Sequence, residues 1–341
     1  MAEQPNMPDL VFVHLSDIHF RKGCTGDIHD ENKKLRHELG LDLRRLRTEL
    51  PRFDGLLVSG DIAYGGKPEE YDYARNWLES IRELVECDHK GVMVTPGNHD
   101  IDRSLIPVNG EIDLLQGEIR GAGSIRDCDN ALTAMLRDPL RGASLLLPLS
   151  AYNAFAEQYG CRVTRDCPYW QRDFPLRDGT VLRVCGLTTT LISGLHDHLQ
   201  THKMIYGAAQ QNFLREPNVR LAIIGHHPPS WTLEGDDADR VFSTLTAFQT
   251  FGHKHDQWIT PLGNGVRLIA GAIHPDRRET QWQPRYAAIA ITTIDDRHLK
   301  LEIYPRRWSD EEFLFMADYN SQGKKVREYT VTVEARQPNL N

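Results

Sequence analysis

The sequence predicts an α/β protein with a largely parallel sheet. Short apolar runs at Leu10–Leu15, Gly55–Val58 and Gly91–Thr95 each end at a turn that carries Gly or Asp. Continuous apolar runs of this length are typical of strands that are buried on both faces. Helical patterns separate the three runs, and this alternation of strand and helix favours right-handed βαβ units.

The helices between these strands are predicted from apolar periodicity. Apolar residues recur every three or four positions from Tyr71 to Val85, and Pro68 suits the first turn of that helix. A second pattern of this kind runs from Leu39 to Leu46. Both segments are therefore expected to pack one face against the sheet.

The rest of the chain is interpreted as the same domain, with one insertion. Residues 1–341 contain no internal repeat and no low-complexity linker, so a single domain is predicted. A helical insertion is expected at about 101–175, because Glu111–Tyr159 is mostly helical in pattern, and a β-rich part is expected at about 266–335. Further strands are predicted at Thr180–Gly186, Arg220–Gly225, Val266–Ala270, Tyr286–Thr292, Lys300–Tyr304 and Glu328–Glu334.

Composition narrows the classes of partner. Lys plus Arg is 40 and Asp plus Glu is 48, which gives a net charge of −8. Such a chain lacks the overall basic field of non-specific nucleic-acid binders, so a nucleic-acid partner stays open but is not favoured. No apolar run approaches the ~20 residues of a membrane span, and the first ten residues lack a signal-peptide pattern. We therefore expect a cytoplasmic protein without a membrane partner; the sequence specifies no oligomeric state.

Five short motifs carry the chemistry. In open α/β sheets, the loops at the carboxyl ends of strands converge on the ligand site, and there the motifs would bring carboxylates, an amide oxygen and imidazoles together. This mixture of oxygen and nitrogen donors suits Mn, Fe, Zn or Co and lacks the thiolates of structural zinc sites. The motifs are DIH at 17–19, GD at 60–61, GNHD at 97–100, GHHP at 225–228 and GHKH at 252–255.

The spacing within the motifs has physical content. Residues i and i+2 of an extended segment point the same way, so Asp17 and His19 can hold one ion, as can His253 and His255. A glycine precedes the polar residues of four motifs and permits a tight turn beside the ions.

The motif set resembles the calcineurin-like metallophosphoesterase superfamily, whose order is DxH, GD, GNH, GHH or similar, then GHxH. All five motifs occur here in that order between Leu10 and His255. The resemblance implies an αββα sandwich of two mixed sheets flanked by helices, and two divalent metal ions, with Mn favoured. In style the motifs are most similar to the cyclic-nucleotide phosphodiesterase branch.

The resemblance also implies roles for individual residues. Ligands of the first ion would be Asp17, His19 and His255; Asp61 would bridge; and ligands of the second ion would be Asn98, His226 and His253. His99 would orient the substrate and protonate the leaving oxygen. The role of His227 stays open, since it could lie at the rim of the substrate site or pack in the interior. Asp100 is expected to support the turn that carries it. Tyr64 is interpreted as rim or packing, and His274 is a weaker candidate for approaching the site.

The predicted function is phosphodiester hydrolysis. Two divalent ions bring +4 and two carboxylates bring −2, and a bridging hydroxide leaves +1, which attracts a phosphodiester monoanion. Metal coordination lowers the pKa of water toward ~7, so the resemblance implies in-line attack by a metal-bridging hydroxide on a cyclic or other small nucleotide. A metal-dependent nuclease and a phosphomonoesterase are alternatives, and an interaction scaffold of the same fold is the non-enzymatic one. Four aromatic residues could stack on a base, although packing is the more frequent role of such residues: Tyr169, Trp170, Trp231 and Trp258.

Overall fold

The computed structural model describes residues 7–23, 30–50, 52–197, 203–278 and 282–335. Within them, the first of two mixed sheets has the strand order β12-β11-β10-β1-β2-β3, with β13 paired to β11. Strands β1, β2 and β3 are parallel, whereas β10 to β13 pair antiparallel. The bounds are β1 Leu10–Leu15, β2 Gly55–Val58, β3 Val92–Val94, β10 Arg285–Thr293, β11 His298–Ser309, β12 Leu314–Ala317 and β13 Arg327–Thr332.

The second sheet has the order β4-β5-β6-β7-β9-β8. Its four central strands are parallel, and its two edge strands, β4 and β8, pair antiparallel. The bounds are β4 Trp170–Pro175, β5 Val181–Gly186, β6 Val219–Gly225, β7 Thr246–Phe251, β8 Trp258–Pro261 and β9 Val266–Ile269.

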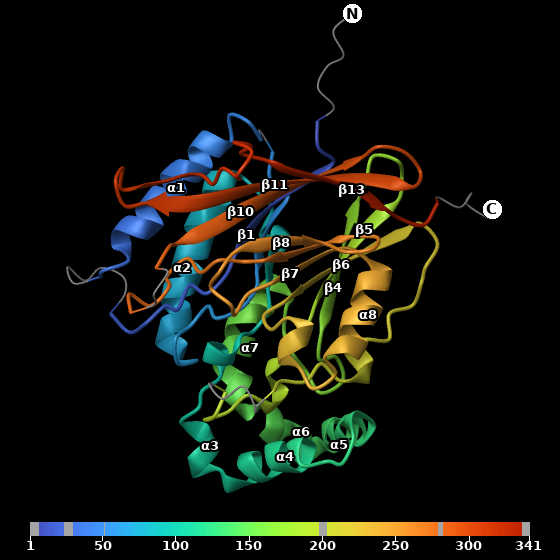
Figure 1. The fold of residues 1–341 in the computed structure, drawn as a ribbon. Helices are drawn as coiled ribbons and strands as arrows, with labels where there is room; N and C mark the ends of the chain where they lie inside the picture. Colours follow the sequence, from blue (N-terminus) through green and yellow to red (C-terminus); the bar gives the residue numbers. More distant parts are fainter. Residues whose placement is uncertain (1–6, 24–29, 51, 198–202, 279–281, 336–341) are drawn as a thin grey trace, which may run out of the picture.

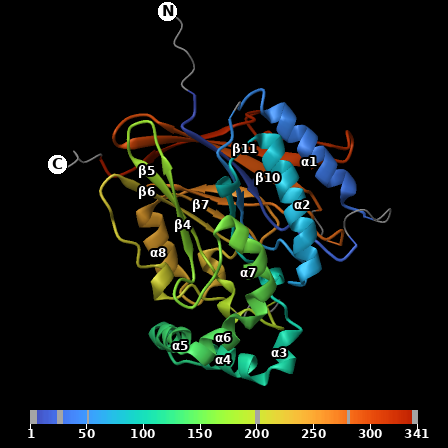
Figure 2. The same ribbon diagram turned by 180° about the vertical axis from the view of Figure 1, so that it is seen from behind.

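Helices cover the outer faces of both sheets, as Figures 1 and 2 show from opposite sides. Helices α1 (Lys33–Leu46) and α2 (Pro68–Val85) pack on the first sheet, where their apolar residues join the main core. Helix α8 (Asp236–Leu245) packs on the second sheet through Ala238 and Phe242, which form a separate core with residues of β5, β6, β7 and β9. The predicted αββα sandwich of two mixed sheets is therefore confirmed.

Helix α2 shows how its sequence specifies its limits. Pro68 occupies the first turn, and the Glu70 side chain accepts hydrogen bonds from the backbone N–H groups of Gly65 and Lys67. The buried residues of the helix include Tyr71, Ala74, Leu78, Ile81 and Val85. The helix ends at Glu86, whose φ of 58° is left-handed. Its apolar stripe is the one predicted from periodicity.

The helical segment after β3 comprises α3 (Leu105–Val108), α4 (Gly110–Arg120), α5 (Ile125–Arg137), α6 (Pro139–Leu146) and α7 (Ser150–Ala156). Helices α3 to α6 gather at one end of the molecule, at the bottom of Figures 1 and 2. The region expected to be helical extended to residue 175, but Trp170–Pro175 forms strand β4. Trp170 and Phe174 turn inward while Gln171 and Asp173 are exposed, and this period of two produces an edge strand.

Short 3-10 turns are η1 His89–Gly91, η2 Asn98–Asp100, η3 Leu147–Leu149, η4 Glu157–Tyr159, η5 Thr190–Ile192, η6 Ala208–Gln210 and η7 Pro229–Trp231.

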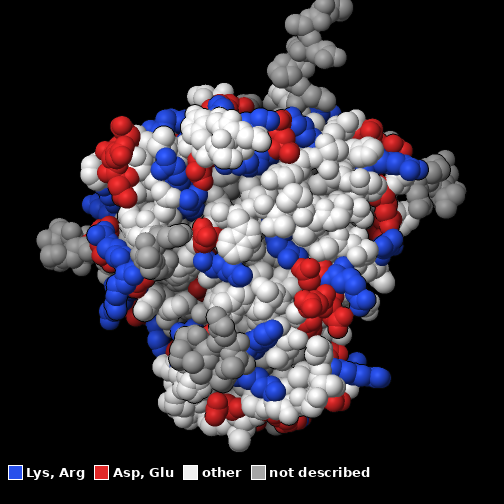
Figure 3. Space-filling view, viewed as in Figure 1, with Lys and Arg blue, Asp and Glu red and all other residues white. Residues whose placement is uncertain are grey.

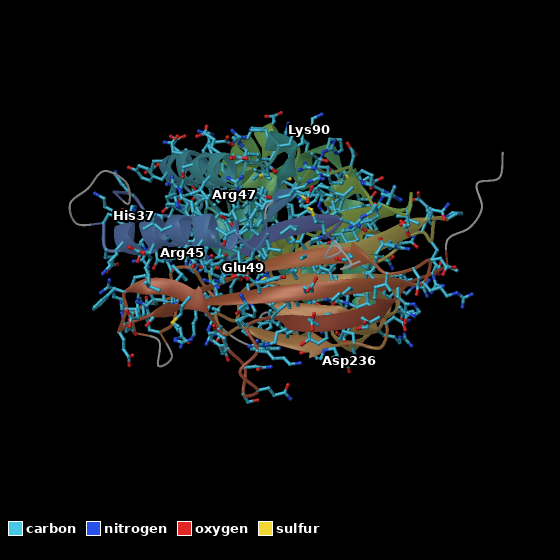
Figure 4. The ribbon with its side chains drawn as sticks, turned by 90° about the horizontal axis from the view of Figure 1, so that it is seen from above. His37, Arg45, Arg47, Glu49, Lys90 and Asp236 are labelled. Atoms are coloured by element: carbon cyan, nitrogen blue, oxygen red, sulfur yellow. The ribbon has the colours of Figure 1, made fainter. Side chains whose placement is uncertain are left out.

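Side-chain contacts join helix α1 to the first sheet and to the end of α2. Asp42 is fully buried and accepts hydrogen bonds from the Tyr286 hydroxyl at 2.6 Å and from two nitrogens of Arg306 at 2.6 and 2.7 Å. Arg45 and Arg47, labelled in Figure 4, reach the Phe315 carbonyl and the Glu86 carboxylate respectively. Arg45 and Arg47 therefore take part in tertiary contacts as well as facing solvent.

Candidate metal centre

The five motifs lie at the carboxyl ends of parallel strands from both sheets. In the first sheet, the DIH motif follows β1, GD follows β2 and GNHD follows β3; in the second sheet, GHHP follows β6 and GHKH follows β7. Because parallel strands end at the same edge of a sheet, two facing sheets bring all five loops to one place.

The backbone of the site has an unusual conformation. Five non-glycine residues of the motifs have positive φ: Asp17 at 53°, His19 at 52°, Asp61 at 52°, His253 at 71° and His255 at 56°. Left-handed conformations are uncommon for side-chain-bearing residues and cost about 1–3 kcal/mol each when strained. The strain is concentrated on residues whose side chains meet, so the surrounding hydrogen bonds must hold it in place.

Those hydrogen bonds come from neighbouring loops. The backbone N–H groups of Ile18 and His19 both donate to the Asp61 carbonyl at 2.9 Å, and His99 N–H donates to Asp61 Oδ1 at 2.8 Å. The buried Asp100 carboxylate accepts from three backbone N–H groups, including Gly97 at 2.8 Å, and from the Tyr71 hydroxyl at 2.9 Å. Asp100 therefore fixes the turn that carries Asn98 and His99.

Glycines allow the loops of the two sheets to meet. At Gly252, an added Cβ would lie 2.2 Å from Ser16 Oγ and 2.8 Å from the Ser59 carbonyl oxygen. At Gly60, which has φ of 89°, it would lie 2.7 Å from His226 Nδ1. Any other residue would push the two loop sets apart, which is the physical basis for glycine at these motif positions.

The side chains form a cluster around two buried carboxylates. His19 Nε2 lies 3.1 Å and His226 Nε2 lies 3.3 Å from Asp61 Oδ2, and His255 Nε2 lies 3.2 Å from Asp17 Oδ1. Four overlapping sets have potential ligand atoms within 4.8 Å of one another. They are Asp17, His19 and His255; Asp17, Asp61 and His226; His19, Asp61 and His99; and His226, His227 and His253.

Two features of the cluster fit cations. Asp17 Oδ1 and His226 Nε2 are buried and make no well-directed hydrogen bond within the described residues, although buried polar atoms are normally paired. Their polar neighbours, His255 Nε2 and Asp61 Oδ2, are themselves candidate ligand atoms. The ring of His226 has its Nδ1 2.7 Å from the Ser59 carbonyl oxygen, so Nδ1–H donates there and Nε2 faces the cluster. A backbone acceptor on one ring nitrogen is the usual support of a metal-ligating histidine.

The electrostatic field of the cluster favours positive charge. Burial would raise the pKa of Asp17 and of Asp61, but nearby histidines, His255 for Asp17 and His226 for Asp61, outweigh burial and lower both. Burial also opposes protonation of His226, yet the Asp61 carboxylate raises its pKa to about 9. Burial and then His226 lower the pKa of His253 to about 3. Histidine must be neutral to bind a metal, so a divalent ion bound beside these ionised carboxylates would displace the proton of His226.

His99 lies at the mouth of the cluster. Its Nδ1 is 2.8 Å from the Tyr64 carbonyl oxygen, and its ring centre is 4.8 Å from that of His19. The Tyr64 ring is 44% exposed and lies between His99 and the guanidinium of Arg21, which is 3.9 Å above it. Tyr64 therefore lies on the rim, within reach of His99, and does not enter the carboxylate cluster.

The structure adds two residues that the sequence left open or missed. His227 Nε2 lies 3.1 Å from Asn98 Oδ1, and its Nδ1 lies 2.7 Å from Thr189 Oγ1, so His227 is part of the cluster. Arg103 donates to the Asn98 carbonyl at 3.0 Å and brings a permanent positive charge beside the site. The sequence signal that could have identified Arg103 is its position three residues after the GNHD motif.

His274 approaches the backbone of the site. Its N–H donates to the Asp17 carbonyl, and its Nδ1 contacts the Ile18 carbonyl oxygen. The residue supports the loop after β1 from behind, and it belongs to none of the four candidate ligand sets.

The geometry of the site and the comparison with known families indicate the same class of protein. The chain belongs to the calcineurin-like phosphoesterase family, whose model matches residues 10–257. The resemblance inferred from the motifs is confirmed.

Two individual relatives match this chain at low identity or over a short stretch. The chain is 23% identical over 335 residues to an uncharacterized metallophosphoesterase-like protein, YydB, of Bacillus subtilis (strain 168), covering 93% of this chain and 63% of the relative. It is 32% identical over 97 residues to the glycerophosphodiester phosphodiesterase GpdQ of Enterobacter lignolyticus (strain SCF1), covering 27% and 30%. The chain thus spans less than two thirds of either relative.

Solved structures give low similarity scores. A putative 5′-nucleotidase from Staphylococcus aureus has a TM-score of 0.41 and 13% identity, with 96% of this chain and 55% of that chain covered. Vacuolar protein sorting 29 from Cryptosporidium parvum has a TM-score of 0.41 and 9% identity, with 96% and 100% covered. Within the described part of this chain, no helix combines the length and apolarity needed to cross a membrane.

Proposed function

We propose that the protein is a binuclear-metal-dependent phosphoester hydrolase that acts on diesters. One observation carries the proposal: Asp61 Oδ2 lies within 3.3 Å of both His19 and His226, which belong to different candidate ligand sets. A carboxylate in that position suits a bridge between two ions. Family membership supports the same reading.

The proposed ligands divide between two ions, with Mn favoured. When bound, the ions would lower the pKa of a water molecule and neutralise phosphate charge. Asp61 would serve both ions, and His227 is an additional candidate on the side of Asn98. The first ion would take Asp17, His19 and His255, and the second would take Asn98, His226 and His253.

The chain's own residues would handle the leaving group. With Nδ1–H donated to the Tyr64 carbonyl, His99 presents Nε2 to the cluster, where it can carry a proton. The oxygen of water bonds to phosphorus as the bond from phosphorus to the leaving oxygen breaks. His99 gives its proton to that oxygen, and the proton lost by the water restores the protonated His99. A general acid of this kind contributes about 10²–10⁴-fold. Arg103 would add positive charge for the phosphate.

A small nucleotide diester is the favoured substrate. The local similarity to a phosphodiesterase supports a diester over a monoester. On the face in Figure 3, basic side chains are interspersed with acidic ones, which favours a small substrate over a nucleic-acid duplex. The helical segment borders the site, since Arg103, two residues before α3, donates to the Asn98 carbonyl, and it is the candidate region for substrate choice.

The test is hydrolysis of bis-p-nitrophenyl phosphate against p-nitrophenyl phosphate. Metal-stripped protein is reloaded with Mn²⁺, and a His99→Ala variant serves as control. Metal-dependent turnover that favours the diester and falls about 10²-fold or more in the variant supports the proposal. Preference for the monoester redirects it to a phosphatase. Absence of bound metal and of turnover would favour the interaction scaffold.

A further inference from the structure

A cavity of about 590 Å³ opens beside the candidate metal centre. Its volume is in the range of small-molecule sites, roughly 300–1,000 Å³. His253 belongs both to the cavity and to a candidate ligand set, so a group attached to a metal-bound phosphate could enter the cavity directly. The lining is Lys203, Ser230, Trp231, His253, Lys254 and Trp258.

The two indoles lie on different elements and offer π-surfaces to the cavity. Trp231 ends the η7 turn, and its ring packs against His253 with centres 4.2 Å apart and planes at 76°. Trp258 begins strand β8 and is 38% exposed. An exposed indole on a concave site is suited to stacking on a flat aromatic group.

The two lysines give the cavity its charge. Lys254 Nζ lies 5.1 Å from the Trp258 ring centre, and Lys203 is held near Trp231 because Met204 N–H donates to the Trp231 carbonyl at 3.0 Å. Among the described residues, neither lysine has a carboxylate partner within 4.0 Å, and none of those that line the cavity is acidic. The cavity therefore offers two positive charges to a ligand that is both aromatic and anionic.

We propose that this cavity holds the nucleoside of a linear nucleotide diester that bears a second phosphate. The base stacks on Trp231 or Trp258, and the second phosphate contacts Lys203 and Lys254, while the scissile diester lies at the metal centre. This inference rests on the proposed function and sharpens its substrate class. A cyclic mononucleotide has a single phosphate, so it would leave both ammonium groups without an anion.

The experiment compares the dinucleotide pApA, which carries a terminal 5′-phosphate, with ApA, which lacks it, and with 3′,5′-cyclic AMP. Each is assayed with Mn²⁺-loaded protein, and bis-p-nitrophenyl phosphate reports the chemistry alone. We expect kcat/KM for pApA to exceed that for ApA by about ten-fold, since charge-assisted contacts to phosphate are strong. Lys203→Gln should remove most of this ratio. Trp258→Ala should lower kcat/KM for both dinucleotides about ten-fold relative to kcat/KM for bis-p-nitrophenyl phosphate.

Lys90→Gln is the matched control. Lys90 lies in η1, before β3 and therefore at the opposite end of the sheet from the site, and its exposed side chain is labelled in Figure 4. The substitution makes the same change of charge and should leave the ratio of pApA to ApA as in the parent protein. An unchanged ratio in Lys203→Gln, or cyclic AMP turned over as well as pApA, would overturn the inference.

Binding without turnover separates the inference from the proposed function. Quenching of tryptophan fluorescence by pApA is measured in metal-stripped protein, where hydrolysis is not required. Quenching that weakens in Lys203→Gln and Trp258→Ala supports the cavity even if the loaded protein hydrolyses no diester. Equal quenching in the parent and both variants refutes the cavity even if bis-p-nitrophenyl phosphate is hydrolysed.

Discussion

Replacement of Gly97 by alanine tests whether the position of Asp61 controls the site. A Cβ on Gly97 would lie 2.1 Å from Asp61 Oδ1 and 2.4 Å from Asp61 N. The φ of Gly97 is −102°, a value that alanine adopts freely, so the effect is purely steric. Relief to a tolerable contact of 3.0 Å requires a shift of 3.0 − 2.1 = 0.9 Å in the Asp61 carboxylate or the loop.

A displacement of about 1 Å in a catalytic group costs about 10²-fold in rate, and overpacking costs about 1–3 kcal/mol of stability. We expect Gly97→Ala to bind less Mn²⁺, measured by elemental analysis after dialysis. Its turnover of bis-p-nitrophenyl phosphate should fall about 10²-fold, and it should unfold at a lower concentration of urea.

Gly117→Ala provides the control for this substitution. Gly117 lies within helix α4, and an added Cβ there would meet nothing within 4 Å. Alanine should stabilise the helix by about 0.5–1 kcal/mol and leave metal content and turnover as in the parent protein. Parental metal content and turnover in Gly97→Ala would show that the Asp61 carboxylate does not control the site.

Three further predictions concern individual aspartates. Asp61→Asn should abolish turnover and leave the folded circular dichroism spectrum intact; full activity would remove the bridging role. Asp42→Ala leaves the Arg306 guanidinium buried without its carboxylate, so urea unfolding should show a loss of about 3–5 kcal/mol, and a loss below 1 kcal/mol would contradict the role of this contact. Burial disfavours ionisation of Asp178, but hydrogen bonds from Thr180 and the charge of Arg220 lower its pKa overall. The resulting stability is present above the unfolded pKa of about 3.9 and is lost as pH falls through the folded pKa. Asp178→Asn should therefore cost about 1 kcal/mol at pH 7 and less below pH ~4, and a deficit that grows in acid would refute this assignment.

Much of the fold was predictable because several strands are apolar throughout. The run Leu10–Leu15 is buried at every position and forms β1 with the predicted bounds. Strand β7 (Thr246–Phe251) escaped prediction because its buried face includes Gln249 and Thr250. Neighbouring strands supply partners for polar groups of this kind, and Gln249 accepts from Arg267 of β9 at 2.9 Å. Local hydropathy does not reveal such a strand because its pairing is tertiary.

The sequence by itself determined the family, the sandwich fold and the set of side chains that meet at the strand ends. It could do so because each motif is local: a strand end, a glycine and a polar residue lie within a few positions. Only the tertiary structure decided that His227 and Arg103 contact Asn98. It alone also decided that Lys203 and Trp258, 55 positions apart, line one cavity. Such contacts depend on how loops from two sheets approach one another, and that approach is set by packing across the whole sandwich.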